Sequence, residues 1–160
     1  MKLKKIVEES YNDYKKPHMF LCTCFCDGKC YKELNYSENL CHNSSIMWEE
    51  NKDFNDDDII TLYLKNKITN AIVIGGLEPF EQFEELLAFV ENFRLKFNQN
   101  DDIVIYTGFY ENEITKQLKM LSVFENVIVK FGRFIPNQKK HYDEILGVEL
   151  ANQEQYAKKI

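Results

Sequence analysis

Five cysteines lie close together near the N-terminus, and they constrain this chain more than any other feature. They are Cys22, Cys24, Cys26, Cys30 and Cys41. An odd number of cysteines cannot all pair as disulfides, and the thiols of a cytosolic protein stay reduced. Thiolates are soft ligands, and groups of them select zinc or iron–sulfur centres. The sequence therefore predicts a metal or iron–sulfur site as the functional centre of the protein.

Composition and charge exclude several other classes of protein. The chain has 160 residues, 44% of them hydrophobic, which predicts a single domain over residues 1–160 with a buried core. The formal net charge of −6 gives no electrostatic reason to expect nucleic acid as a partner. No apolar run is long enough to span a membrane, and Met1 to Lys16 lacks the apolar centre of a signal peptide. We therefore expect a cytoplasmic protein with neither a nucleic acid nor a membrane as its partner.

Apolar runs alternate along the chain with segments of helical periodicity. The runs predict buried strands at residues 18–22, 71–74, 103–106 and 127–129. The periodic segments predict helices at residues 55–66, 79–97 and 111–121. This alternation predicts an α/β fold with a largely parallel sheet.

Ligands of parallel sheets bind beyond the carboxyl ends of the strands. Three of the predicted strand ends carry distinctive residues here: the cysteine loop at about residues 22–48, Gly75 to Pro79, and Tyr106 to Gly108. We expect these three segments to meet at one edge of the sheet.

The residues by themselves leave two kinds of metal centre open. A structural zinc ion takes four ligands, often as two closely spaced pairs. Cys26 and Cys30 supply one such pair, whereas the adjacent side chains of Cys41 and His42 diverge. One interpretation is a zinc ion held by Cys24, Cys26, Cys30 and Cys41. The other is a three-cysteine set that leaves one iron of a cubane cluster open for a substrate.

Two motifs carry a resemblance to a known family. Cys26-Asp-Gly-Lys-Cys30 opens the cysteine loop, and Cys41-His42-Asn43, followed by Trp48, closes it. Gly75-Gly76-Leu77-Glu78-Pro79 then follows the second strand of the predicted core. In these motifs the chain resembles the radical S-adenosylmethionine enzymes, and more narrowly the small activating proteins of anaerobic ribonucleotide reductase.

Weaker matches extend the resemblance over most of the chain. They are Tyr106-Thr107-Gly108, Phe131-Gly132-Arg133-Phe134 and Leu150-Ala151-Asn152-Gln153. The chain departs from the family pattern at Leu77, which is an additional residue, and at Tyr31 to Leu40, where the family has a much shorter spacer between its cysteines.

The resemblance implies a fold and a set of site residues. The fold is a small partial (β/α) barrel of parallel strands, of the radical S-adenosylmethionine type. The implied ligands of a 4Fe-4S cluster are Cys26, Cys30 and Cys41. Cys22 and Cys26 have the same spacing as Cys26 and Cys30, but we expect Cys22 to belong to the preceding strand. We expect Cys24 to be the spare thiol nearest the cluster. The residues implied to bind S-adenosylmethionine are His42, Asn43, Gly75, Gly76, Glu78 and Thr107, with Glu78 accepting from the amino group.

The resemblance also implies a mechanism and partners. S-adenosylmethionine binds the open iron, and one electron cleaves it to methionine and a 5′-deoxyadenosyl radical. The radical then takes hydrogen from a glycine of a glycyl-radical enzyme such as anaerobic ribonucleotide reductase. An external donor of the flavodoxin or ferredoxin type supplies the electron. No catalytic acid or base is needed, and His18 and His141 are isolated in the sequence.

Two other functions are compatible with the same sequence. One is another small radical S-adenosylmethionine enzyme that modifies a peptide or a small molecule, because fold resemblance does not fix the substrate. The other is a zinc-binding interaction module without catalysis.

Overall fold

The chain is built on a seven-stranded sheet whose four central strands run parallel. The computed structural model describes residues 1–41 and 43–160. The strand order is β3-β1-β2-β4-β5-β6-β9. The central strands are β2 (His18–Thr23), β4 (Ala71–Gly75), β5 (Asp102–Tyr106) and β6 (Val127–Phe131). The antiparallel outer strands are β1 (Lys2–Ser10), β3 (Lys52–Asp53) and β9 (Tyr156–Lys159).

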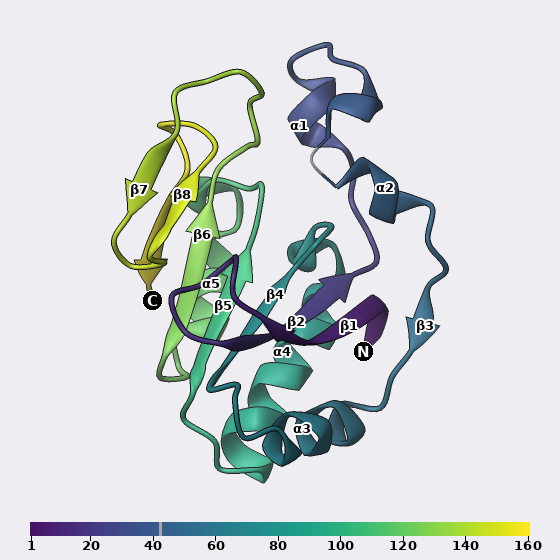
Figure 1. Cartoon of the computed structure of the whole chain (residues 1–160), viewed down its shortest axis with the longest axis vertical. Helices are drawn as coiled ribbons and strands as arrows, with labels where there is room; N and C mark the ends of the chain where they lie inside the picture. The colour runs from purple at the N-terminus through teal and green to yellow at the C-terminus, as the bar shows by residue number, and fades with distance from the viewer. Residues whose placement is uncertain (42) are drawn as a thin grey trace.

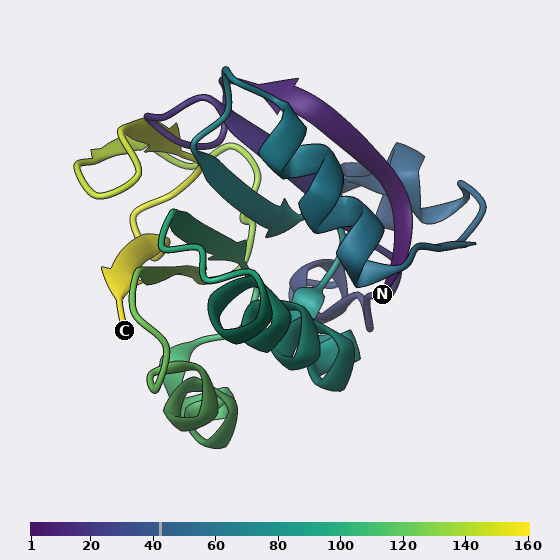
Figure 2. The ribbon, with the colours of Figure 1, turned by 90° about the horizontal axis from the view of Figure 1, so that it is seen from below.

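Helical segments connect the parallel strands and cover one face of the sheet. They are α3 (Asp56–Lys65), α4 (Phe83–Glu91) and α5 (Thr115–Leu121). Short 3-10 turns at Pro79–Gln82 and Glu111–Glu113 precede the last two, and a π-helical turn at Asn92–Lys96 follows α4. Figure 2 shows the three helices side by side in a row. Parallel strands joined in sequential order by crossovers of one hand place their helices on a single face.

The alternation of side chains along each strand builds two cores. Ile72 and Ile74 of β4 face the helices, where they share a core with Leu86 and Phe89 of α4. Ala71 and Val73 face the opposite side. Since every second residue of a strand points to the same face, a continuous apolar run such as this one buries both faces.

A small hairpin covers the second face. It consists of β7 (His141–Asp143) and β8 (Val148–Leu150), which pair with each other and not with the main sheet. Leu146 and Leu150 of this hairpin pack with Tyr14 against the strands. Figure 1 shows the hairpin beside β6, near the end of the chain.

The cysteine loop contains three short helical turns. These are α1 (Lys29–Lys32), a 3-10 turn at Glu38–Leu40, and α2 (Ser44–Met47). Figure 1 shows α1 and α2 above the edge of the sheet where the parallel strands end. The inserted segment 31–40 is thus helical at both of its ends, in α1 and in the 3-10 turn.

The sequence-based prediction of alternating strands and helices is confirmed for the four central strands and the three helices. The strands β1, β3, β7, β8 and β9 were not predicted. Within the described residues the sheet is open, with β3 and β9 at its edges. No helix in this part of the chain is long and apolar enough to cross a membrane.

Candidate metal centre

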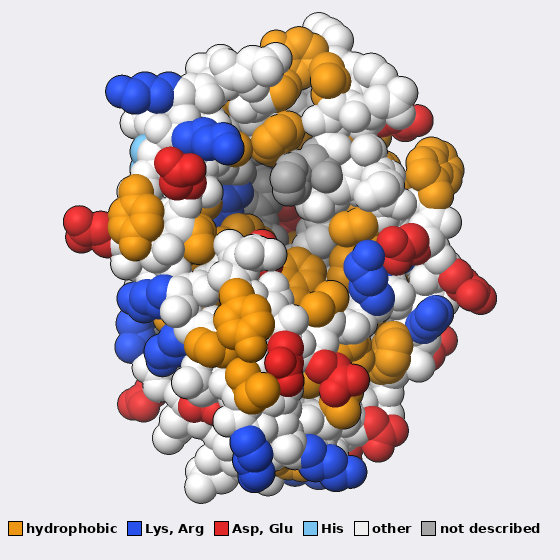
Figure 3. Space-filling view, viewed as in Figure 1, with side chains coloured by type: hydrophobic (Ala, Val, Ile, Leu, Met, Phe, Trp, Pro, Cys, Tyr) orange, Lys and Arg blue, Asp and Glu red, His pale blue; other side chains and the backbone are white. Residues whose placement is uncertain are grey.

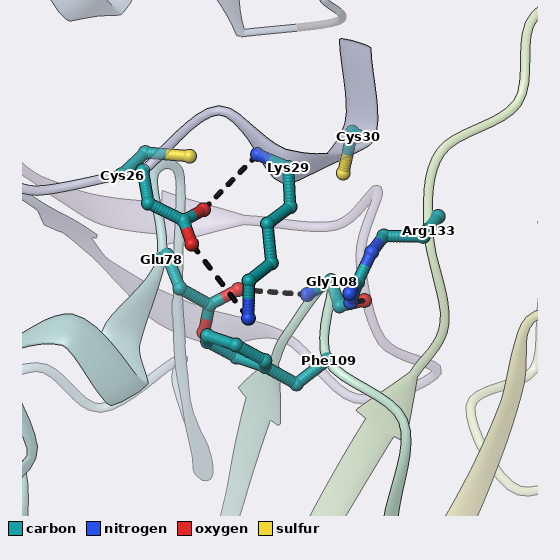
Figure 4. A pocket seen from close by; sticks show the side chains of 8 residues that line it. Cys26, Lys29, Cys30, Glu78, Gly108, Phe109 and Arg133 are labelled. Atoms are coloured by element: carbon teal, nitrogen blue, oxygen red, sulfur yellow. Dashed lines mark hydrogen bonds and ion pairs between the residues drawn. The ribbon is translucent and has the colours of Figure 1, made fainter. Parts of the chain in front are cut away.

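The carboxyl ends of the four parallel strands meet beneath the cysteine loop. A pocket between them is lined by residues from the loop and from three of these ends: Cys26, Asp27, Lys29, Cys30, Glu78, Gly108, Phe109 and Arg133. Figure 4 shows Cys26, Lys29 and Cys30 on one side of the pocket, facing Glu78, Gly108 and Phe109. The space-filling view shows a hollow in this region with basic and acidic side chains inside it (Figure 3). The prediction that separate strand ends meet at one edge is therefore confirmed.

Two thiols, those of Cys26 and Cys30, line this pocket, and Cys41 interacts electrostatically with Cys30. The backbone between the first two turns at Gly28, whose φ of 74° belongs to the left-handed region that glycine favours. The Gly28 N–H donates to Cys26 Sγ over 3.3 Å. Burial nevertheless raises the pKa of Cys26 to about 11, so without a metal this side chain is a neutral thiol near neutral pH.

The other two cysteines lie apart from this group. Cys22 is a fully buried residue of β2, as expected. A Cβ at Gly76 would stand 2.3 Å from Cys22 Sγ, so the thiol occupies the space that the glycine leaves free. Cys24 is buried too, and its charged neighbours are Lys4 and Glu85, outside the pocket. Cys24 does not line the pocket, and its place as the spare thiol nearest the cluster stays a prediction.

Backbone and side-chain hydrogen bonds fix the loop to the end of β4. The Glu78 N–H donates to the Phe25 carbonyl over 2.6 Å, and Asn43 Nδ2 donates to the Gly76 carbonyl. The φ of 87° at Gly76 lets the chain turn sharply there. Asn43, Gly75 and Gly76 therefore lie together, whereas His42 lies outside the described residues.

Glu78 is the most buried carboxylate at the pocket, with 6% of its surface exposed. Its Oε1 accepts from Thr107 Oγ1 over 2.7 Å and from the Phe80 N–H over 3.1 Å. Its Oε2 accepts from the Gly108 N–H over 2.8 Å. Burial raises the pKa of Glu78 to about 7, although these three hydrogen bonds and Lys130 favour the charged form. Glu78 thus joins the ends of β4 and β5, and it brings Thr107 to the site.

Arg133 holds the cysteine loop to the end of β6, a role that the sequence did not reveal. Its guanidinium is 4% exposed and binds Glu33, with Nε–Oε2 and Nη2–Oε1 distances of 3.0 and 3.1 Å. It also donates to Glu113 Oε1 over 2.7 Å and to the Gly108 carbonyl. Burial alone would lower the pKa of Arg133, but the hydrogen bonds to both carboxylates raise it overall.

Lys130 is the second charged residue that the sequence analysis missed. Its side chain is 6% exposed, and its ammonium interacts with Cys30 and Glu78. Burial lowers the pKa of Lys130 to about 8, and the other two groups oppose this shift. A lysine between apolar strand residues normally indicates a solvated face, so the pattern around Lys130 does not point to a buried cation.

Comparison with known families identifies the chemistry of the thiol group. A model of the 4Fe-4S single cluster domain family matches residues 17–154, most of the chain. The chain belongs to this family. Neither the curated proteins nor the solved structures contain a significant match. For a 4Fe-4S single cluster domain, the cysteine loop is the obvious source of ligands, because thiolates hold such clusters.

The thiols of the cysteine loop have the chemistry that a cluster requires. Each thiolate of a cubane cluster binds its own iron, so the ligands stand around the cluster. Cys26 and Cys30 line the same pocket and interact electrostatically with each other, and Cys41 interacts with Cys30. Among the described residues, no group of three Cys, His, Asp or Glu side chains could hold a single metal ion.

Proposed function

We propose that this iron–sulfur protein is a small radical S-adenosylmethionine enzyme with Cys26, Cys30 and Cys41 as its cluster ligands. One observation carries the proposal. Two of these cysteines share a pocket with Glu78, and this pocket lies at the carboxyl ends of parallel strands. The pocket therefore joins a thiolate set to a buried acidic group, which is the combination that an iron–sulfur cluster and an amino-acid cofactor require.

The topology supports the proposal as well. Strands β2, β4, β5 and β6 follow one another in order, and their helices cover one face. A parallel sheet wound in one direction is the architecture of a (β/α) barrel, here reduced to four central strands and open at both sides. We interpret the sheet as a partial barrel of the radical S-adenosylmethionine type, with antiparallel strands at its borders.

Glu78 has the chemistry needed to bind the ammonium of S-adenosylmethionine. An ionised carboxylate offers about four acceptor positions. The Glu78 carboxylate accepts three hydrogen bonds, and Oε2 accepts only one of them, from the Gly108 N–H. Oε2 therefore retains an acceptor position at the pocket. An ammonium placed there would also favour the charged form of this buried carboxylate.

Other residues of the chain orient the ligand and close the site. Asn43 is held against the glycine turn after β4 by its bond to the Gly76 carbonyl, and Thr107 is held in place by its bond to Glu78. The Phe134 backbone forms a hydrogen bond with Cys30, and Arg133 and Lys130 interact with it electrostatically. Each of these three interactions favours the thiolate form of Cys30. When bound, the cluster would supply the electron that cleaves S-adenosylmethionine to methionine and a 5′-deoxyadenosyl radical.

The substrate proposed is a glycine in a partner protein. A glycyl-radical enzyme such as anaerobic ribonucleotide reductase would present this glycine, and a flavodoxin or ferredoxin would supply the electron. The resemblance of the cysteine loop and of Gly75 to Pro79 to the reductase-activating proteins supports this choice. Cleavage without a partner, together with modification of an added peptide or small molecule, would instead favour the broader enzyme class.

Anaerobic reconstitution with iron and sulfide tests the proposal. We expect a brown protein that converts S-adenosylmethionine to 5′-deoxyadenosine and methionine when dithionite reduces it, measured by liquid chromatography. The Glu78→Gln variant separates the two cofactors, because it should keep the cluster and weaken S-adenosylmethionine binding. A colourless protein that retains zinc, or a brown one that never cleaves S-adenosylmethionine, would refute the proposed reaction.

A further inference from the structure

Lys130 is a buried cation with few partners of its own. It lies on β6 opposite Tyr106 of β5, and its Nζ stands 5.8 Å from the centre of the Tyr106 ring. The same Nζ donates to the Gly132 carbonyl over 3.1 Å. An ammonium has three donor hydrogens, and this is the single hydrogen bond recorded for it within the described residues.

The ionic surroundings of Lys130 differ from those of its neighbour Arg133. Arg133 is neutralised by Glu33 and Glu113. Lys130 forms no ion pair with a carboxylate in the part of the chain that the structure describes, and the ionisable groups that interact with it are Cys30 and Glu78. Burying a charge without a paired ion is costly, so folds rarely retain one without a use.

Lys130 lies beside the proposed metal centre, because its carbonyl accepts from the Thr107 N–H over 2.9 Å and Thr107 Oγ1 donates to Glu78. The thiolates that hold an iron–sulfur cluster, Cys30 among them, bring negative charge to this place. A fixed positive charge in a site of low dielectric interacts strongly with any negative charge that forms there. The unpaired ammonium of Lys130 therefore acquires its missing counter-charge when the cluster assembles.

We propose that Lys130 is an electrostatic positioning residue that stabilises the thiolate-bound cluster and raises its reduction potential. This role rests on ligation by Cys30 but not on S-adenosylmethionine. Reduction takes one electron from the external donor, forms no bond and adds one negative charge to the cluster. The positive charge of Lys130 stabilises the reduced state more than the oxidised state, because the reduced state carries that additional negative charge.

The reduction potential of the reconstituted protein tests this role directly. Lys130→Met removes the charge and retains an apolar side chain of similar length, so the potential should shift to a more negative value. The variant should also lose its iron faster than the wild type when a chelator is added. Lys65→Met is the matched control, because Lys65 is exposed at the end of α3, which Figure 1 shows at the far end of the sheet from α1 and α2. Its potential should equal that of the wild type.

A second variant keeps the test decisive if the methionine substitution impairs folding. Lys130→Gln has no charge but can still donate to the Gly132 carbonyl, so it should show the same negative shift. A wild-type potential and wild-type iron retention in either folded variant would overturn the proposed role. Failure of S-adenosylmethionine cleavage would not affect this result, since the potential is measured without that cofactor.

Discussion

The three proposed ligand thiols and the two buried ones should respond differently to substitution. Cys41 interacts electrostatically with Cys30, which lines the pocket, whereas Cys22 is part of the strand β2. Cys41→Ala should abolish cluster binding because it removes the thiolate of one iron. Cys22→Ala should retain the cluster and reduce the free energy of unfolding by about 1 kcal/mol, the cost of a small cavity. Iron and sulfide content per chain after anaerobic reconstitution measures the difference.

The choice of the first two ligands is tested by the same measurement. Cys22 and Cys26 have the same spacing as Cys26 and Cys30, so spacing alone cannot decide between the pairs. Cys24→Ala is the control, since its side chain is also buried outside the pocket. If Cys22→Ala lost the cluster and Cys30→Ala kept it, the ligand set would begin with Cys22 and Cys26 instead of Cys26 and Cys30.

At the scale of elements, Arg133 fastens the cysteine loop to the sheet. It connects Glu33, at the end of α1, with Glu113 and with the Gly108 carbonyl. Arg133→Met should remove these contacts and lower stability by about 1–3 kcal/mol, the range for hydrogen bonds to charged groups. Because Glu33 is half exposed, we expect the lower part of this range. Faster hydrogen exchange of residues 24–41 would show that the loop opens locally.

An exposed ion pair provides the control for this substitution. Lys158 and Glu111 form one, with Nζ–Oε2 at 2.8 Å, between β9 and the turn before α5. Lys158→Met should leave hydrogen exchange in the cysteine loop unchanged. Equal exchange in the Arg133 variant and the wild type would mean that other contacts, such as those of Glu78 and Asn43, hold the loop.

The elements that could be predicted from the sequence are those buried on both faces. Ala71 to Gly75 and Val127 to Phe131 are continuous apolar or nearly apolar runs, and such runs indicate central strands. The antiparallel outer strands carry no such pattern. In β1, Lys2, Lys5, Glu8 and Glu9 face solvent, so its pattern is that of a charged surface segment. Pairing with β2, a tertiary contact, determines its structure.

The same distinction applies to the site. Cys26, Cys30 and Glu78 could be singled out because cysteine spacing and a glycine turn are local patterns. Lys130 and Arg133 could not be singled out, because the residue type alone does not distinguish a buried cation from an exposed one. Their roles depend on the distance between β6 and a loop far away in the chain, which only the fold determines.

At the scale of the whole molecule, Glu78 couples the stability of the cluster-free protein to pH. Burial raises its pKa from 4.5 to about 7. Between these values the folded chain keeps a proton that the unfolded chain has released. Stability therefore falls as the pH rises through this window, by about 3 kcal/mol from this group, since each pKa unit corresponds to about 1.4 kcal/mol.

Glu78→Gln should remove this contribution to the pH dependence, because an amide does not titrate. The substitution also exchanges one acceptor for a donor beside the Gly108 N–H, so the absolute stability should fall at low pH. The quantity to compare is therefore the change in unfolding free energy between pH 5 and pH 8, from urea denaturation of both metal-free proteins. The wild type should lose stability over this range by up to about 3 kcal/mol more than the variant. Parallel pH profiles for the two proteins would show that Glu78 is already ionised at low pH. Its three hydrogen bonds and Lys130 would then outweigh its burial, and the metal-free pocket would hold a carboxylate ready to accept an ammonium.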